Sequence, residues 1–393
     1  MTTTYQFPAV ADAVARLPRV VDLLAARAQE HDRDAGFPYQ GIEAVHEAGL
    51  LTLTVAERHG GAGGGLADTV RVLVELGRGD PSVALLCAQT LLAHAQQTGA
   101  HPSSRWPEGV YRELLADSVR GPALVGRLPG AATASARLEG GRWILTGRKT
   151  GVPGAEALAW MAVTARTEEE PPREGVFLVP GDSPGIQVEP SGDQLGLRAS
   201  ASHDVLLLDV AVDPEAVLGL RADRQPGPAH VPEAWANIAV PAVYLGVARA
   251  ARDWLVTALR RGDADAATVA AVGLVEVELT GAEELLLSAA GRVDDSARDT
   301  AHDTDRDGGS DRDGTDRDGG SGEALRRSAA VRMLATRAAV GAVQQIVAIS
   351  GSAGLSRANP LERHLRDVLH AHTLDPSDAE LLRAAGRQAL GGS

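Results

Sequence analysis

The feature that most constrains this chain is a change from helix-type to strand-type sequence near residue 118, and a change back near residue 226. On both outer sides, apolar residues recur at three- and four-residue steps, as they do on one face of an amphipathic helix. Between the two changes, short runs with β preference are separated by Gly and Pro, as strands are by turns. We therefore expect a mostly α protein with a central β domain.

The first unit, residues 1–117, is expected to be a helical domain. Asp80-Pro81 favours a helix start, because an Asp side chain caps the first amide groups and Pro suits the first turn. Asp68 and Asp80 are interpreted as helix caps rather than as metal ligands. The expected helices are Val10–Glu30, Tyr39–Ala48, Leu66–Leu76 and Pro81–Gln97.

The second unit, residues 118–225, is expected to be a compact β domain. Glu139-Gly-Gly141 separates two strand-like runs and predicts a hairpin. The expected strands are Ala134–Leu138, Trp143–Thr146, Leu158–Thr164, Gly175–Val179, Ile186–Glu189 and His203–Val212.

The third unit, residues 226–393, contains long Ala- and Leu-rich segments with apolar stripes, which indicate a helical bundle. Residues 294–322 hold ten Asp and four Arg, a net charge of −6, and are predicted to be a disordered Asp/Gly-rich insertion. Asp303 begins a pattern similar to a calcium loop, but Gly314 stands where the bidentate Glu is required, so a linker is favoured. The expected helices are Ala239–Arg261, Ala266–Val293 and Glu323–Ile349.

Charge and cysteine content disfavour several classes of protein. The net charge of −14 argues against a nucleic-acid-binding protein, since phosphate contacts need a basic surface. Cys87 is the single cysteine, which excludes an internal disulfide and leads us to expect a reducing, cytoplasmic location. The sequence shows neither a signal-peptide pattern nor an uninterrupted apolar run long enough to cross a membrane. No zinc-type Cys/His cluster is present, and no metal is expected.

Short sequence motifs from all three units occur in the order in which one enzyme family carries them. They are Phe37-Pro38, Glu47-Ala-Gly-Leu50, Leu195-Gly-Leu-Arg-Ala-Ser-Ala-Ser-His-Asp-Val205 and Pro360-Leu-Glu-Arg-His-Leu-Arg-Asp367. With them, nearly the whole chain outside residues 294–322 resembles the acyl-CoA dehydrogenase superfamily. The resemblance implies an N-terminal helical domain, a β-barrel or β-sandwich middle domain and a C-terminal four-helix bundle. It also implies a homodimer or homotetramer, with flavin between the β domain and the bundle and a partner subunit completing the site.

The resemblance implies a flavoprotein that carries out α,β-dehydrogenation of an acyl-CoA or acyl-carrier thioester with FAD and a separate electron acceptor. Such relatives remove the α-proton with a Glu in a Tyr-Glu-Gly-Thr motif, and burial can tune the pKa of that carboxyl group. Asp375 falls on this position, within Leu374-Asp-Pro-Ser377, and is the expected base. A turn or capping role for Asp375 is the alternative interpretation.

The superfamily also contains flavin-dependent monooxygenases, which use oxygen and reduced FMN or FAD supplied by a flavin reductase. Ser202-His-Asp-Val205 and His372-Thr-Leu-Asp-Pro376 resemble this branch. Its members use His and Ser side chains around the flavin, and His94 and His372 are the candidates here. His370 shares the local face of His372 less well. The expected Ser is replaced, because Thr150-Gly-Val-Pro153 stands in its segment.

The resemblance also assigns contacts to the cofactor and to a small-molecule substrate. Relatives carry Thr-Glu where this chain has Gly126-Arg127, an aromatic residue at Gly151 and a Gly at Ser352. These departures leave a third possibility, a non-catalytic paralogue that acts as a scaffold. Arg198 and Ser202 are the expected substrate contacts, although ion pairs of Arg198 and Arg363 with the nearby Asp204 and Asp367 are the structural alternative. The expected cofactor contacts are Leu128, Thr133, Ser135, Gly151, Pro153, Ser350 and Gly351.

Overall fold

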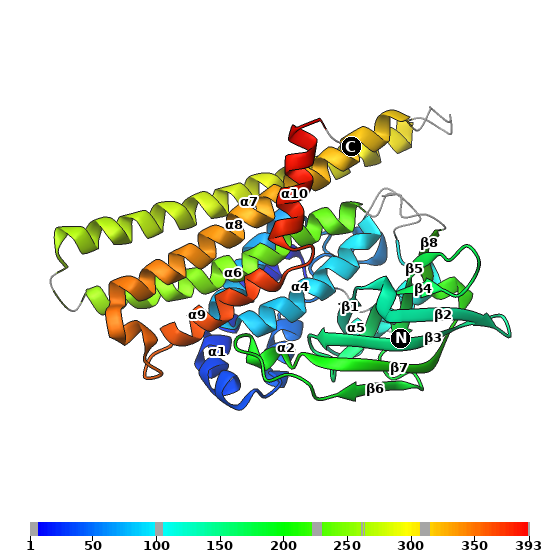
Figure 1. Cartoon of the computed structure of the whole chain (residues 1–393), viewed down its shortest axis with the longest axis horizontal. Helices are drawn as coiled ribbons and strands as arrows, with labels where there is room; N and C mark the ends of the chain where they lie inside the picture. The colour runs from blue at the N-terminus through cyan, green and yellow to red at the C-terminus, as the bar shows by residue number, and fades with distance from the viewer. Residues whose placement is uncertain are drawn as a thin grey trace.

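The computed structural model describes residues 7–98, 105–221, 230–260, 262, 264–306 and 315–391. Helices occupy both outer parts of the sequence and a sheet lies between them, so the predicted fold class is confirmed. The β domain sits at one end of an elongated helical body, whose long helices run away from the sheet (Figure 1).

The N-terminal helices are α1 (Val10–Asp34), α2 (Tyr39–Glu47), α3 (Leu66–Gly79), α4 (Pro81–Ala95) and α5 (Glu108–Arg120). Both predicted caps are confirmed. Asp80 accepts a hydrogen bond from the Ser82 N–H at 2.9 Å at the start of α4, and Asp68 accepts one from the Gly65 N–H at 3.2 Å at the start of α3. Such bonds satisfy amide groups that have no partner inside the helix.

Helix α4 is the central element of the fold. It packs against α3 and α6 of the helical body and against strand β1 of the sheet. Every residue of α4 except Gln89 is buried, which explains why its sequence is apolar on all sides. Through α4, the helical body and the β domain share one continuous core.

The described strands are β1 (Leu124–Leu128), β2 (Ala134–Glu139), β3 (Arg142–Val152), β4 (Leu158–Thr167), β5 (Glu174–Pro180), β6 (Ile186–Glu189), β7 (His203–Val212) and β8 (Val217–Arg221). They form one mixed sheet in the order β6-β7-β3-β2-β4-β5-β8, with β1 parallel to β4. The predicted hairpin is confirmed, since β2 pairs antiparallel with β3. Gly140 and Gly141 make its turn with φ angles of 58° and 81°, a conformation that favours glycine.

The C-terminal part consists of α6 (His230–Leu259), α7 (Ala266–Arg306), α8 (Thr315–Ser350), α9 (Leu361–Leu369) and α10 (Asp378–Ala389). Helix α6 packs closely on α3, and two glycines allow this. A Cβ atom on Gly77 would lie 2.4 Å from the carbonyl oxygen of Val243, and one on Gly246 would lie 2.2 Å from that of Val74. Any larger residue at either position would push the two helices apart.

The predicted disorder of residues 294–322 is wrong over most of its length. Helix α7 continues to Arg306 and α8 begins at Thr315, while residues 307–314 lie outside the described part of the chain. Asp294 accepts hydrogen bonds from the backbone N–H groups of Leu66 and Ala67 at 2.7 and 3.0 Å. The Asp294 carboxylate on α7 thus caps the N-terminus of α3. The dipole of α3 favours negative charge at this end. Asp303, the first residue of the pattern similar to a calcium loop, lies within α7.

Two further expectations concern whole segments. The stretch Glu323–Leu355 is long and apolar enough to cross a membrane by length and composition, and a third of its most apolar window is buried within the chain. Its main part, α8, packs along α6 and α7, as a helix of a bundle does. The division into domains at residues 117/118 and 225/226 stays our proposal, and α5 extends past the first boundary to Arg120.

Among the described residues, no three His, Cys, Asp or Glu side chains gather to hold a metal ion.

Candidate functional site

The carboxyl end of β1 forms the first part of the candidate site. Leu128, an expected cofactor contact, is buried there with 1% of its surface exposed. The backbone N–H of Arg127 donates a hydrogen bond to Oε1 of Gln89 at 2.8 Å. Because Gln89 belongs to α4, this bond ties the end of β1 to the centre of the helical body.

Lys149 on β3 holds the loop that follows β1, a role that sequence patterns did not reveal. Its Nζ donates hydrogen bonds to the carbonyl oxygens of Pro129, Gly130 and Thr164 at 3.0, 2.6 and 2.6 Å. The residue is 3% exposed, and burial lowers the pKa of its ammonium group to about 8. The sequence feature that could have drawn attention to this residue is that Lys149 is the sole lysine of the sequence.

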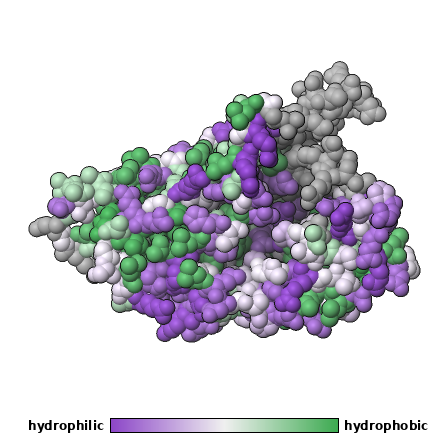
Figure 2. Space-filling view, in the orientation of Figure 1, coloured by the Kyte–Doolittle hydropathy of each residue, from purple (hydrophilic) through white to green (hydrophobic). Residues whose placement is uncertain are grey.

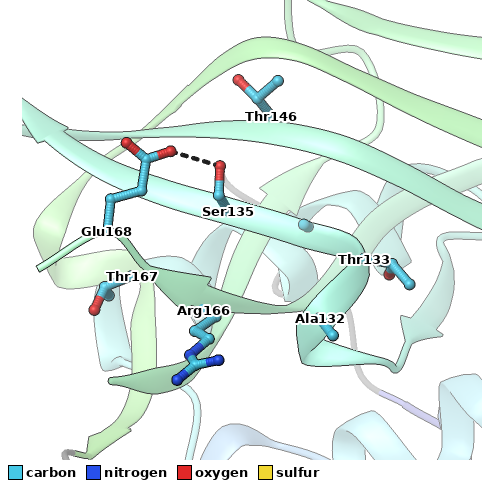
Figure 3. Close-up of a pocket in the computed structure, with 8 residues that line it drawn as sticks. Ala132, Thr133, Ser135, Thr146, Arg166, Thr167 and Glu168 are labelled. Carbon is cyan, nitrogen blue, oxygen red and sulfur yellow. Dashed lines mark hydrogen bonds between the residues drawn. The ribbon is translucent and has the colours of Figure 1, made fainter. Parts of the chain in front are cut away.

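Thr133 and Ser135, two expected cofactor contacts, line an open cavity of about 380 Å³ (Figure 3). The Ser135 hydroxyl donates a hydrogen bond to Oε1 of Glu168 at 2.7 Å, and the Thr133 hydroxyl donates one to the Gly130 carbonyl at 2.8 Å. Arg166 also lines the cavity and points to the opposite side of its strand from Glu168 (Figure 3). Both hydroxyl protons are donated within the chain and the Glu168 carboxylate also lines the cavity, so these hydroxyls are not free donors for a cofactor phosphate group.

Gly151 and Pro153 lie at the end of β3 and just beyond it. The Gly151 N–H already donates to Oδ1 of Asp204 at 3.1 Å, so it is not free for a cofactor. Hydrogen bonds from Ser191, Gly151 and Arg148 hold the pKa of the Asp204 carboxyl below its usual range. Gly151 has a φ angle of 61° and open space where a Cβ atom would stand, so a flat ring could approach its backbone closely. Pro153 is half-buried.

Arg198, an expected substrate contact, connects two segments of the protein. Its Nε donates to the backbone carbonyl of Asp32 on α1, and its Nη1 donates to the carboxylate of Asp193, both at 2.7 Å. The alternative ion pair between Arg198 and Asp204 is wrong, because Arg148 occupies the Asp204 carboxylate at 2.8 Å. The structure therefore gives Arg198 a structural role, and its contact with substrate stays a prediction.

Ser202, the other expected substrate contact, is buried, and its hydroxyl lies 2.8 Å from that of Ser200. The ion pair between Arg363 and Asp367 is present, with Nε and Oδ2 separated by 4.0 Å. Burial raises the pKa of the Asp367 carboxyl to about 7, although Arg363 acts in the opposite direction. The side chains of both pairs, Ser200 with Ser202 and Arg363 with Asp367, are buried.

His94 is placed deep inside α4. Its side chain is fully buried, and Nδ1 lies 3.1 Å from the hydroxyl of Tyr111 on α5. Burial lowers the pKa of the imidazole to about 4, so the ring is neutral near pH 7. Its Nε2 is buried without a hydrogen-bond partner among the described residues. Its hydrogen bond and its ring contact are both with Tyr111 rather than with the segments expected to bind cofactor, so its catalytic role stays a prediction.

The two histidines that follow α9 occupy different environments. His372 is exposed, whereas His370 is half-buried and its Nδ1 lies 2.9 Å from the hydroxyl of Tyr244 on α6. The two rings also stack, with centroids 6.3 Å apart. Burial raises the pKa of the Tyr244 hydroxyl and lowers that of His370. Both groups are therefore neutral near pH 7, and if the Tyr244 hydroxyl is the donor, the proton of the imidazole lies on Nε2.

Asp375, the expected base of a dehydrogenase, lies in the turn before α10. Its side chain is exposed. Arg332 on α8 holds the turn by donating a hydrogen bond to the Asp375 carbonyl oxygen at 3.1 Å and another to that of Pro376. These bonds fix the backbone but leave the carboxylate in solvent.

Ser350 and Gly351 lie at the end of α8 that points away from the β domain (Figure 1). The Ser350 hydroxyl donates a hydrogen bond to the carbonyl oxygen of Ile346 at 2.8 Å, and Gly351 is exposed with a φ angle of 59°. Within one chain, this turn is therefore not brought to the other expected cofactor contacts. A contact with flavin would need a second copy of the chain.

A hollow with hydrophilic walls separates the β domain from the helices below α10 (Figure 2). Arg127 has an exposed side chain, and desolvation lowers the pKa of its guanidinium. Glu233, near the start of α6, is the acidic residue that acts on it. We did not predict Arg127 as a site residue, although it lies in the segment that the resemblance expects to bind the cofactor.

Comparisons with known proteins identify the family. The descriptions of the acyl-CoA dehydrogenase N-terminal, middle and C-terminal domains match residues 11–101, 128–210 and 238–374, in this order. The putative acyl-CoA dehydrogenase YdbM of Bacillus subtilis (strain 168) is 29% identical over 94% of this chain and 95% of its own length. The amino sugar nitrososynthase DnmZ of Streptomyces peucetius is 29% identical over 90% of this chain and 86% of its own length.

Solved structures agree with this result. KijD3 in complex with FMN and dTDP-3-amino-2,3,6-trideoxy-4-keto-3-methyl-D-glucose matches with a TM-score of 0.86 and 26% identity, over 100% of this chain and 96% of KijD3. The three domain matches together span the helical, β and bundle parts of the described fold. The chain therefore belongs to the acyl-CoA dehydrogenase superfamily.

Proposed function

We propose that this protein is a flavin-dependent monooxygenase that uses reduced flavin and oxygen on a small molecule. The observation that carries the proposal is the contrast between His370 and Asp375 in the turn between α9 and α10. His370 is half-buried and oriented by Tyr244, whereas the Asp375 carboxylate is exposed. Dehydrogenation of an acyl thioester needs a base of raised pKa, and a solvated carboxylate is a weak one.

The chain's own residues give His370 a defined role. We propose the tautomer in which the Tyr244 hydroxyl donates to Nδ1, so that Nε2–H is the group that a substrate or an oxygen atom can use. Because burial lowers the pKa of His370, the ring is neutral near pH 7 and can take up a proton at Nδ1 only by losing the bond from Tyr244. We therefore propose that His370 donates a hydrogen bond from Nε2 to the reacting group.

The residues around the β domain fit a flavin cofactor, FMN or FAD. The open space at Gly151 allows a flat ring to approach the backbone. When bound, reduced flavin supplies the electrons with which oxygen is activated. A separate reductase would supply the reduced flavin. A second copy of the chain, in a homodimer or homotetramer, would bring Ser350 and Gly351 to the site.

The substrate class is proposed from the relatives. DnmZ is named an amino sugar nitrososynthase, and KijD3 was solved with a dTDP-linked amino sugar. We propose that this chain oxygenates an amine nitrogen of a small molecule, in the cytoplasm. The relative YdbM is named a putative acyl-CoA dehydrogenase, so acyl-CoA is the competing substrate.

Two reactions separate these functions. The purified protein is mixed with FMN or FAD and an acyl-CoA series without oxygen, and bleaching of the flavin absorbance is followed. In parallel, it is given reduced FMN, oxygen and dTDP-linked amino sugars, and oxygenated products are sought by mass spectrometry. We expect products that depend on the amino sugar and no bleaching. Bleaching by an acyl-CoA that Asp375→Asn abolishes would instead establish the dehydrogenase.

A further inference from the structure

Asp367 on α9 is a buried acidic residue that binds a segment of the β domain. Its Oδ1 accepts a hydrogen bond from the backbone N–H of Leu197 at 2.8 Å, and both residues are buried. The backbone of α9 also touches this segment, because a Cβ atom on Gly196 would lie 2.2 Å from the carbonyl oxygen of Arg366. Residues 196–200, here called the connecting segment, are therefore fixed to α9 by a hydrogen bond and by close packing.

The other end of the connecting segment is bonded to the turn that follows β3. The Ser200 N–H donates to the Leu197 carbonyl oxygen at 2.9 Å, and the Gly154 N–H donates to the Ser200 carbonyl oxygen at 2.7 Å. Gly154 directly follows Pro153, which is an expected cofactor contact together with Gly151. The segment thus joins α9 to the part of the β domain at which flavin is expected.

His370 is joined to the same acidic residue. At the end of α9, the backbone N–H of His370 donates a hydrogen bond to the carbonyl oxygen of Asp367. A continuous series of hydrogen bonds therefore runs from His370 through Asp367 and the connecting segment to Gly154. All of its groups belong to the main chain except the Asp367 carboxylate, so this one side chain decides whether the series is complete.

The backbone of the connecting segment supports a functional interpretation. Leu197 has a φ angle of 51°, and Ala201, directly after the segment, has one of 42°. Both lie in the left-handed region, which costs energy for residues other than glycine. Such conformations persist only where their surroundings hold them, and they gather at functional sites. The bond from the Leu197 N–H to Asp367 is one of the contacts that hold this conformation.

We propose that Asp367 is a positioning residue, which holds the end of β3 and the flavin ring expected there at a fixed distance from His370. The inference rests on the proposed function, in which His370 donates a hydrogen bond to the reacting group. Asp367 acts through the connecting segment and does not itself touch cofactor or substrate. A displacement of about 1 Å can lower a rate by about a hundredfold, so loss of the bond should affect turnover more than binding.

The test measures kcat and KM with dTDP-linked amino sugars, and the dissociation constant of reduced FMN, for the wild type and three variants. Asp367→Leu removes the acceptor, and Gly196→Ala pushes the connecting segment away from α9. In both variants, kcat should fall by about tenfold or more, while KM and the dissociation constant change by less than about threefold. Asp367→Asn keeps an acceptor oxygen for the Leu197 N–H, so its kcat should stay within about threefold of the wild type.

A control variant separates positioning from stability. Asp294→Ala also removes buried hydrogen bonds, but it does so at the start of α3, far along the chain from the connecting segment. Its kcat should stay within about twofold of the wild type. An equal fall in kcat for Asp294→Ala and Asp367→Leu would overturn the inference, because it would reduce the role of Asp367 to stability. Unchanged kcat in both Asp367→Leu and Gly196→Ala would overturn it as well.

Hydrogen exchange on the wild type decides the matter if the variants fail to fold, since Asp367→Leu leaves the buried charge of Arg363 without its partner. The amide hydrogens of Leu197 and Gly154 should exchange slowly, because both are bonded inside the protein. Exchange of either amide at the rate of an exposed loop would overturn the inference. A wild type that forms no oxygenated product shows instead that the proposed function fails, which is a separate outcome because exchange does not depend on activity.

Discussion

Tyr244 on α6 and His370 after α9 form a stacked pair joined by a hydrogen bond of 2.9 Å between the Tyr hydroxyl and Nδ1. The two residues are 126 positions apart in the sequence, so only the packing of α9 against α6 brings them together. The pair joins a buried helix to the turn where the superfamily resemblance placed the catalytic group. It fixes the position of the imidazole, which is a property that a proton donor needs.

The first prediction concerns the pKa of His370. In the proposed tautomer, the hydrogen bond from Tyr244 stabilises the neutral ring, because Nδ1 can accept it only while unprotonated. In Tyr244→Phe, the pKa of His370 should therefore rise toward its ordinary value. Histidine resonances followed by NMR between pH 4 and pH 8 measure this change, with His370→Gln to assign the signal. A pKa that stays the same or falls would contradict the geometry, and the exposed His372 should be unaffected.

The second prediction concerns Lys149, the sole lysine. With labelled lysine, the protein should give one side-chain NMR signal that titrates near pH 8, because burial lowers its pKa from 10.5 to about 8. The unfolded chain then binds more protons between these two values, so this group's contribution to the free energy of unfolding increases as the pH rises through them. Titration near pH 10.5 would mean that Nζ is in solvent.

The same residue gives a third prediction, on the loop after β1. Lys149→Met removes the donor from three carbonyl oxygens, and we expect it to lower the free energy of unfolding by about 2–3 kcal/mol. It should also weaken flavin binding, since the loop of Pro129 and Gly130 loses its support. Urea unfolding and flavin titration measure the two effects. The exposed Arg357, changed to Met as a control, should alter stability by less than about 0.5 kcal/mol.

The order of helical, β and helical parts was predictable because it depends on local periodicity. Each amphipathic stripe reports its own helix, and the Gly140-Gly141 turn and the Asp80 cap act over a few residues. Asp294 shows the limit of such evidence. Its acidic surroundings indicated a disordered linker. However, its carboxylate caps α3 by accepting a hydrogen bond from Leu66, which is 228 positions away in the sequence. No local pattern reveals a partner at that distance.

The candidate site was predictable to the level of a segment but not of a side chain. His372 was expected where His370 has the contact to Tyr244. The two histidines share a 3-10 turn, in which residues two positions apart point in different directions. An error of two positions in the alignment with the family therefore selects an exposed histidine in place of a half-buried one. Likewise, the resemblance assigned Leu128 to the segment expected to bind the cofactor, while the neighbouring Arg127 appeared only as a departure from the family pattern, and both assignments stay predictions.

A fourth prediction uses the burial of His94 to test stability against pH. The folded-state pKa of about 4 is below the ordinary 6.5, so the unfolded chain binds the extra proton between these values. His94 should therefore reduce the free energy of unfolding by about 3 kcal/mol as the pH falls from 6.5 to 4. His94→Gln should lack this loss, as measured by urea unfolding at each pH. The exposed His372→Gln should keep it, and equal slopes for His94→Gln and wild type would refute the burial.

A fifth prediction tests whether residues beyond Val293 belong to the folded structure. Asp294→Ala removes both acceptors at the start of α3, and we expect it to lower the free energy of unfolding by about 1–2 kcal/mol. Asp294→Asn keeps one acceptor oxygen without the charge, so its free energy of unfolding should lie between those of Asp294→Ala and the wild type. The matched control is Asp22→Ala on the exposed side of α1, with an effect of less than about 0.5 kcal/mol. If Asp294→Ala behaves like this control, α7 does not hold α3, and the linker interpretation of residues 294–322 returns.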